Sequence, residues 1–207
     1  MPDTTHKKTS AAKAVQRAPK LGQIERTTKH VLETTAELLA EVGYRELSIE
    51  LVVQRSGVSR STIYRHWNNR AELAIAAFDA ALGPSPPQPD LGDIRSDLVA
   101  VYKRFPVILS RSIWGAVMPS IIEASKTDPL FDGLLADLVN RRKESGREIF
   151  RRAIRRGEIR KDANIEWAID ALDGAYYHRL LITGAKLKDD AMAEWLVDSV
   201  LSQILEH

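Results

Sequence analysis

Apolar residues recur at helical spacing through most of the chain, and no segment shows the alternation typical of a β-strand. In the first third of the sequence, this spacing predicts helices over about residues 23–42, 49–56 and 60–67. A fourth helix opens at Arg70 and places leucine and alanine side chains on one side. We therefore expect a small helical unit over residues 23–82.

The clearest break in the sequence is the segment 83–92, which contains four prolines and two glycines. Such a composition cannot form a helix or a central strand, so we expect a linker here. Beyond it the helical pattern resumes and continues to the end of the chain, which predicts a larger helical unit over residues 93–207. Its helices are expected over about residues 93–110, 113–125, 128–156, 166–183 and 189–205.

The last helix is apolar over more than half of its circumference. A helix that packs on one neighbour needs an apolar stripe of only ~100°, so this helix must bury two sides. Small residues in the preceding helix would allow close approach of a partner. We therefore favour a homodimer formed through residues 165–184 and 189–205 over a fully buried monomer core. The residues concerned are Ala168, Ala171, Gly174, Ala175, Met192, Leu196, Val197, Val200, Leu201, Ile204 and Leu205.

The composition narrows the class of protein. The chain has 207 residues and no cysteine, which excludes disulfides, thiolate metal sites and a cysteine nucleophile. No apolar run is long enough for a membrane span, and the first residues lack the apolar centre of a signal peptide. We therefore expect a cytoplasmic protein without a membrane partner.

Positive charge is concentrated at the start of the chain. Residues 1–30 carry seven lysines and arginines against two acidic residues, while the whole chain has a formal net charge of +2. The polar segment 1–22 is predicted to be a disordered basic arm. Such an arm could hold DNA electrostatically, or it could simply be a solubilising tail.

A short polar helix carries the most specific signal for function. Gly57 suits a sharp turn between helices, and Ser59 suits the N-cap of the helix that follows. That helix contains a single aliphatic residue, Ile63, among side chains that can bind phosphates and base edges. Residues 48–67 therefore predict a helix-turn-helix.

Several stretches of residues 27–82 resemble the DNA-binding domain of the TetR family of bacterial transcriptional regulators. They are Ala36–Tyr44, Leu47-Ser48, Ser56–Trp67 and Asn69–Leu73. The second half is similar to one variety of the family's regulatory domain in Ile121–Ala124, Asp128-Pro129, Arg155–Arg160 and Arg179–Leu181. The resemblance implies an all-α fold, with a three-helix helix-turn-helix domain followed by a helical bundle that binds an effector and dimerises.

The resemblance also implies roles for individual side chains. Ser48 and Tyr64 would contact phosphates, whereas Arg60 and Ser61 would face base edges. Arg65 would lie on the groove side, Thr62 could support either kind of contact, and His66 would lie near the DNA backbone. The full set of expected DNA contacts is Ser48, Ser59, Arg60, Ser61, Thr62, Tyr64, Arg65, His66 and Arg70.

Arg70, which would cap the next helix, matches a position where the family often has a phosphate-binding lysine. The chain departs from the family at Glu50, where many members have a basic residue, and an acidic side chain there would repel DNA if it faced the groove. We therefore expect Glu50 to point away from the groove or to pair with an arginine such as Arg60.

Two further groups of residues are weaker candidates. Residues 141–161 contain ten basic residues and three acidic ones, which could form a second nucleic-acid patch. We favour a solvated helix whose charges pair, for example Glu148 with Arg151 or Arg152. A candidate effector pocket, whose members could equally be ordinary core, comprises Tyr102, Phe105, Trp114, Met118, Tyr177 and His178.

No pattern indicates catalysis, a metal or a cofactor, because the five histidines are scattered. Asp170 and Asp173 lie one turn apart and read as a charged helical face. The sequence thus predicts a homodimeric, ligand-responsive DNA-binding regulator, most simply a repressor of a palindromic operator. The alternatives are a DNA-binding regulator without an effector and a helical enzyme with an accessory DNA-binding head.

Overall fold

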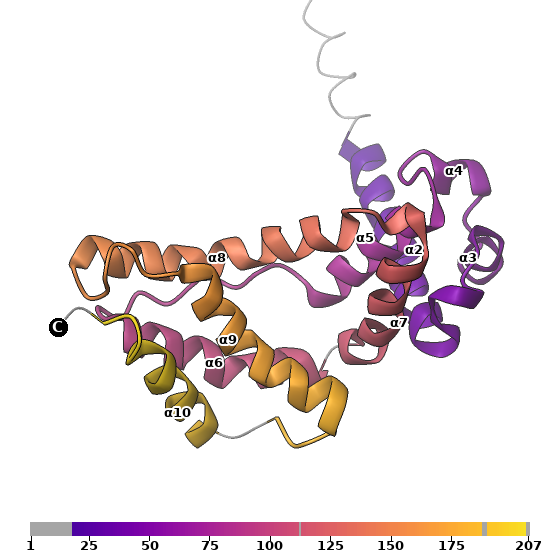
Figure 1. Ribbon diagram of the computed structural model, residues 1–207. Helices are drawn as coiled ribbons and strands as arrows, with labels where there is room; N and C mark the ends of the chain where they lie inside the picture. Colours follow the sequence, from indigo (N-terminus) through magenta and orange to yellow (C-terminus); the bar gives the residue numbers. More distant parts are fainter. Residues whose placement is uncertain (1–17, 112, 188–189, 206–207) are drawn as a thin grey trace, which may run out of the picture.

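The computed structural model describes residues 18–111, 113–187 and 190–205, and the regular elements within them are helices (Figure 1). Most of the basic arm expected over residues 1–22 lies outside the described residues. The first helix begins at Ala18 rather than at the predicted Gln23. Pro19 does not prevent this earlier start, because the first turn of a helix tolerates proline.

The N-terminal unit consists of four helices, as expected. They are α2 (Ala18–Glu46), α3 (Ile49–Ser56), α4 (Arg60–Tyr64) and α5 (Arg70–Leu82). Helix α2 breaks at Gly43, whose φ of 73° is non-helical, so its regular part ends where the sequence predicted. Helix α4 is shorter than the predicted 60–67, because the chain turns after Tyr64 to bury Trp67.

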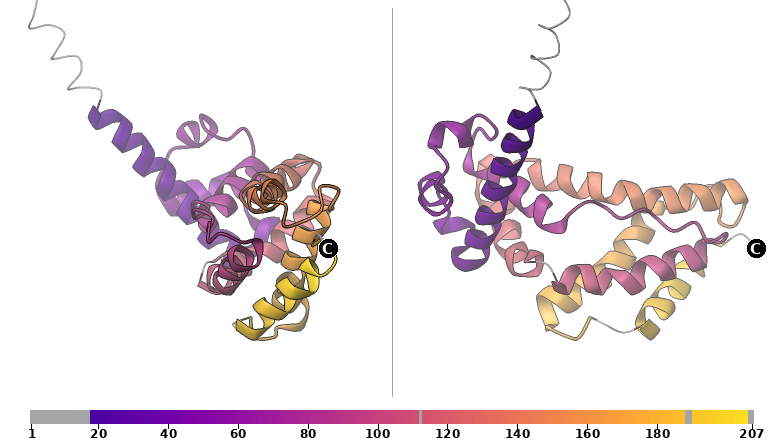
Figure 2. Two further views of the ribbon diagram at one scale, coloured as in Figure 1. Left: turned by 90° about the vertical axis from the view of Figure 1, so that its left-hand side faces the viewer. Right: turned by 180° about the vertical axis from the view of Figure 1, so that it is seen from behind.

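The second unit is a bundle in which α8 and α6 run lengthwise and α9 crosses beside them (Figures 1 and 2). Helices α3 and α4 lie at one end of the molecule, away from α10 (Figure 1). The elements are α6 (Ile94–Arg111), α7 (Trp114–Thr127), the short 3₁₀ helix η1 (Pro129–Phe131), α8 (Leu134–Arg156), α9 (Ile165–His178), the π-helical turn η2 (Arg179–Thr183) and α10 (Asp190–Leu201).

In the second unit, two predicted helix boundaries are wrong. Asp128 caps only η1, and α8 starts after Gly133, whose φ of 74° interrupts the helix expected over residues 128–156. The last helix stops at Leu201 instead of Leu205, because the chain end forms a bridge between Ile159 and Leu205. None of the described helices is long and apolar enough to cross a membrane.

Helix α7 joins the two units into one packed body. It lies against both α2 and α5, and its Val117, Ile121 and Ala124 are buried in a core that continues into the N-terminal unit. At Gly43 an added Cβ would lie 3.8 Å from the Cβ of Ser120 in α7, which is ordinary van der Waals contact. Movement of α7 would therefore be transmitted directly to α2.

A polar contact, which we call the junction, reinforces this packing. The hydroxyl of Tyr44 donates to Oδ2 of Asp128 at 2.8 Å, and Nη2 of Arg70 donates to the same oxygen at 3.1 Å. The guanidinium of Arg70 also lies 4.5 Å from the centre of the Tyr44 ring. The edge of that ring meets Phe131 at 4.7 Å between centroids. One carboxylate thus links α5 and the last turn of α2, beyond the break at Gly43, to η1.

The linker over residues 83–92, called the strap below, is held along α8. Nη1 of Arg142 donates to the carbonyl of Gly83 at 2.7 Å, and Arg152 donates to the carbonyl of Pro89. The amide of Leu91 donates to Oδ1 of Asp97 at 2.7 Å, and the Asp97 side chain is fully buried. The strap is therefore part of the packed structure.

We expect Asp128→Asn to lower the stability of the protein by about 1 kcal/mol, which is about 2–4 °C in Tm. Asparagine keeps a hydrogen-bond acceptor but loses the charge that pairs with Arg70. The amide of Leu130, Tyr44 and Arg70 together hold the pKa of Asp128 below its usual value. The difference in Tm should therefore persist at neutral pH and shrink as the pH falls below about 3.8.

Thermal denaturation of both proteins across this pH range measures the effect. Asp132→Asn, which changes an exposed acid four residues away, is the matched control and should leave Tm almost unaltered. A constant Tm difference down to acidic pH would contradict a charge-based junction.

Candidate nucleic-acid interface and cavity

The turn between α3 and α4 follows from two residues. Gly57 adopts a left-handed conformation with φ of 69°, and its amide donates to the carbonyl of Val53 at 2.9 Å. Ser59 then caps α4, because its Oγ accepts the amide of Thr62 at 3.3 Å and lies 2.9 Å from the Thr62 hydroxyl. The same Oγ lies 3.1 Å from the hydroxyl of Ser61. These contacts fix the orientation of α4.

Helix α4 has one buried and one exposed face. Ile63 is fully buried, and Leu47 and Val52 are buried in the same core. Six predicted DNA-contacting residues in and around α4 are exposed, and Thr62 is half-buried. The exposed ones are Ser59, Arg60, Ser61, Tyr64, Arg65 and His66. A helix supported from one side by core and bare on the other can enter a DNA groove.

Glu50, the acidic residue at a position where the family often has a basic one, forms an ion pair. The Arg60 guanidinium forms an ion pair with Glu50, as predicted, and lies 5.7 Å from the centre of the Tyr64 ring. Both charged side chains are well exposed, so the pair is screened by solvent and contributes little to stability. Glu50 therefore lies beside Arg60 at the start of α4.

The remaining expected contacts lie around this helix, with one exception. Ser48 caps α3 by accepting the amide of Leu51 at 3.1 Å, and His66 is exposed with its ring 5.5 Å from that of Trp67. Arg70 lies at the junction, and its contact with DNA stays a prediction. Its guanidinium is engaged by the junction and by the carbonyl of Leu47 at 3.3 Å, because Asp128 provides a counter-charge there.

Most basic side chains of the segment 141–161 form ion pairs with acidic side chains. Arg147 binds Glu166 and Glu144, and Arg151 binds Glu144 at 2.6 Å and approaches Glu148 at 3.7 Å. Arg155 binds the other side of Glu148 at 2.8 Å. The pairing expected of a solvated helix is present, so most of this charge is matched by acids.

A cavity of about 910 Å³ lies in the second unit. Helices α6, α8 and α9 and the strap form most of its wall. Four of the six residues predicted for a pocket line it: Tyr102, Phe105, Met118 and Tyr177. His178 does not line it and is exposed, because it lies on another side of α9. The side chain of Trp114 lies outside the described residues.

The sequence did not predict that the carboxylate of Asp173 lines this cavity. Asp173 lines the wall and accepts a hydrogen bond from the Tyr102 hydroxyl at 2.8 Å, so it is not part of a solvated face. Burial raises the pKa of Asp173 to about 6, although the Tyr102 hydroxyl and the charge of Lys143 oppose the shift. Helical spacing alone gives no signal that distinguishes Asp173 from the exposed Asp170.

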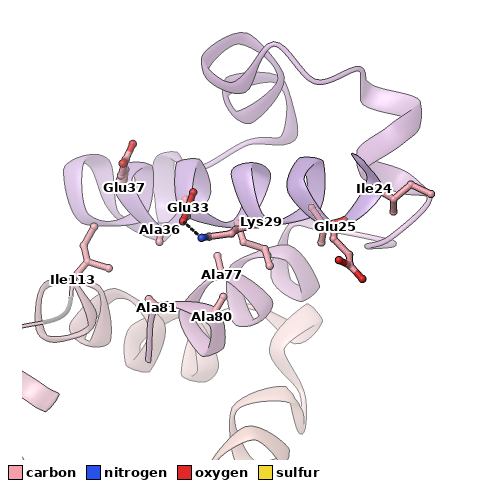
Figure 3. Close-up of a pocket in the computed structure, with 12 residues that line it drawn as sticks. Ile24, Glu25, Lys29, Glu33, Ala36, Glu37, Ala77, Ala80, Ala81 and Ile113 are labelled. Carbon is pink, nitrogen blue, oxygen red and sulfur yellow. Dashed lines mark ion pairs between the residues drawn. The ribbon is translucent and has the colours of Figure 1, made fainter. Parts of the chain in front are cut away.

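A smaller hollow of about 500 Å³ lies between α2 and α5 (Figure 3). Four alanines, Ala36, Ala77, Ala80 and Ala81, line it, together with the ion pair between Lys29 and Glu33. It contains no carboxylate or aromatic group buried against its wall. The larger cavity is therefore the better candidate for a ligand site.

Comparison with known proteins agrees with this geometry. Residues 31–77 match the model of "Bacterial regulatory proteins, tetR family", and residues 88–200 match that of the "Tetracyclin repressor-like, C-terminal domain". The chain is 31% identical over 176 residues to the DNA-binding transcriptional repressor TetR of Mycobacteroides abscessus, covering 83% of this chain and 90% of that protein. It is 28% identical to the HTH-type transcriptional regulator YdeS of Bacillus subtilis, over 84% of this chain and 88% of that one.

Solved structures show the same arrangement. The TetR family transcription regulator SCO0332 matches with a TM-score of 0.65 and 33% identity, covering 85% of this chain and 97% of that chain. FadR from Bacillus subtilis, solved in complex with stearoyl-CoA, shares the fold with a TM-score of 0.64 at 15% identity, over 84% and 97% of the two chains. The chain belongs to the TetR family of bacterial transcriptional regulators, whose members bind DNA through a helix-turn-helix.

Proposed function

We propose that this regulator is a cytoplasmic, ligand-responsive repressor that binds a palindromic operator as a homodimer. The observation that carries the proposal is the packing of α7, which lies against α2 and α5 of the N-terminal unit and contributes Met118 to the wall of the large cavity. Ligand binding in the cavity can then favour one spacing between the two N-terminal units of the dimer, which we call the reading heads. The ligand can shift this spacing only by as much as its affinities for the two dimer conformations differ.

The exposed side chains of α4 read the operator in this proposal. Arg60 and Arg65 hold guanine bases in the major groove, which contributes ~1–3 kcal/mol of discrimination for each good pair. Ser61 and Thr62 reach neighbouring base edges, while Ser48, Tyr64 and His66 bind phosphates. Ser59 acts through its cap, which sets the direction of α4.

Two exposed tryptophans support dimerisation through the last helices. Trp167 of α9 is 75% exposed, and Trp195 of α10 is 69% exposed. Ile182 in η2, 15 residues after Trp167, is 73% exposed. The three side chains lie on α9, η2 and α10, the elements through which the sequence predicts dimerisation. The dimer face therefore centres on residues that differ from the apolar set of α10, since Leu196, Val197 and Leu201 are buried within the protomer.

We expect Arg60→Ala and Tyr64→Phe each to weaken operator binding about tenfold or more, because each removes a contact to a base or a phosphate. The operator is first selected from random DNA with the wild-type protein. Fluorescence anisotropy then measures affinity, and thermal denaturation checks the fold.

The matched control is Arg141→Ala, which removes an exposed arginine of α8 far along the chain from α4. It should leave operator binding unchanged. Wild-type affinity in both Arg60→Ala and Tyr64→Phe would contradict the assignment of α4 as the reading helix.

We expect Glu50→Gln to tighten binding to non-operator DNA severalfold, because it removes an acidic charge beside Arg60. The preference for operator over other DNA should fall, since Arg60 is no longer oriented. Titrations of both DNA types at matched salt measure the ratio. An unchanged ratio would mean that the pair does not orient Arg60 for base contact.

We expect Trp195→Glu to shift the protein from dimer to monomer in sedimentation experiments, because a charge cannot be buried unpaired in the interface. Operator affinity should fall with it. Leu130→Glu introduces the same charge at an apolar residue that is 49% exposed on η1, and it should remain dimeric. A dimeric Trp195→Glu variant would exclude α10 from the interface.

A further inference from the structure

The cavity in the second unit combines aromatic walls with two acidic residues, of which Asp170 is exposed and pairs with Lys143, whereas Asp173 makes no ion pair within the described residues. The ring of Phe105 stands edge-on to that of Tyr102 at 5.7 Å and to that of Tyr177 at 6.1 Å between centroids. All three residues line the cavity, together with aliphatic side chains of α6. Such walls favour an apolar body, and aromatic faces attract a positive charge.

Asp173 lies among these rings without a cationic partner. No ion pair within the described ranges of the chain includes Asp173, and its hydrogen bond comes from the neutral hydroxyl of Tyr102. The charge of Lys143 acts on Asp173, but Lys143 itself pairs with Asp170. A carboxylate that is largely withdrawn from water without a direct ion pair is costly. A ligand that brings a positive charge would remove this cost.

The basic residues around the cavity are, in contrast, engaged by other groups. Lys143 pairs with Asp170, Arg142 with Asp79, and Lys103 with Glu194 at 2.5 Å. Nε of Arg104 donates to the carbonyl of Ala100 in its own helix at 3.1 Å. An anionic ligand would have to compete with these partners, whereas a cation at Asp173 would not.

We propose that the effector of this regulator is an organic cation, an amine or quaternary ammonium group on an apolar body, whose charge binds Asp173 between the rings of Tyr102, Phe105 and Tyr177. This identification rests on the ligand-responsive function proposed above. The apolar body then extends along α6 toward the strap, whose Pro84 and Pro86 also line the cavity.

Binding of such a cation depends on pH in a defined direction. The carboxylate form of Asp173 binds the cation, and burial raises the pKa of this group to about 6. The neighbouring Tyr102 and Tyr177 keep their protons, because burial raises the pKa of both. Lys143 and Asp170 face each other as an ion pair. Affinity should therefore be highest above pH of about 7 and fall toward pH of about 5.

Isothermal titration calorimetry without DNA tests the ligand class. The probes are phenylbutyltrimethylammonium, which carries a permanent positive charge, and phenylpentanoate, an anion of similar size. We expect the cation to bind the wild-type protein at pH of about 8 at least tenfold more tightly than the anion. We expect Asp173→Asn to lose at least tenfold of this affinity and all of its pH dependence.

Asp162→Asn is the matched control, since it makes the same exchange at a carboxyl that is 84% exposed and outside the cavity. It should bind the cation as the wild type does. The Tm of Asp173→Asn reports whether the fold is intact. Tighter binding of the anion, or wild-type affinity for the cation in a folded Asp173→Asn variant, would overturn the proposal.

A second measurement separates this proposal from the proposed function. The cation is added to the complex of the protein with its selected operator, and DNA release is followed by anisotropy. Release by the cation from wild type but not from Asp173→Asn supports both proposals. Binding without release would support the ligand class and contradict the ligand-responsive function.

Discussion

The packing of α7 against α2 and α5 is the constraint on which the rest of the structure depends. It buries the inner residues of α7 in a core shared by both units, and the Asp128 carboxylate closes the contact by binding Tyr44 and Arg70. Close packing transmits displacement, because interiors near crystal density have little free volume. An N-terminal unit joined only by a loose linker would not be displaced by changes in the second unit. Here the two units share a packed core through α7.

The strap adds a second connection between the two units. It leaves α5 at Gly83, lies along α8 and lines the cavity before α6 begins. Arg142 holds it at one end, and the buried Asp97 holds it at the other. Any ligand in the cavity touches a segment that continues directly into α5. The prolines keep this segment extended. The segment thus both lines the cavity and connects α5 to α6.

Local signals in the sequence predict the reading head well, since the caps at Ser48 and Ser59 and the turn at Gly57 depend on neighbours within a few residues. The pairing of Glu50 with Arg60 is also predictable, because adjacent helices of a helix-turn-helix bring these positions together. The junction could not be predicted, since Tyr44 and Asp128 are 84 residues apart and their contact depends on tertiary packing. The same limit explains why the burial of Asp173 could not be predicted. It depends on the packing of α6, whose Tyr102 donates a hydrogen bond to this carboxylate.

The claim that two reading heads act together on one DNA is tested most directly by the distance between them. The chain has no cysteine, so Gln54→Cys on the exposed side of α3 places one spin label in each protomer. Double electron–electron resonance should give a narrow distance distribution in the operator complex, of the order of one DNA turn, roughly 35 Å. The absence of dipolar coupling in the operator complex would contradict the claim, because it would show that a single head binds the DNA.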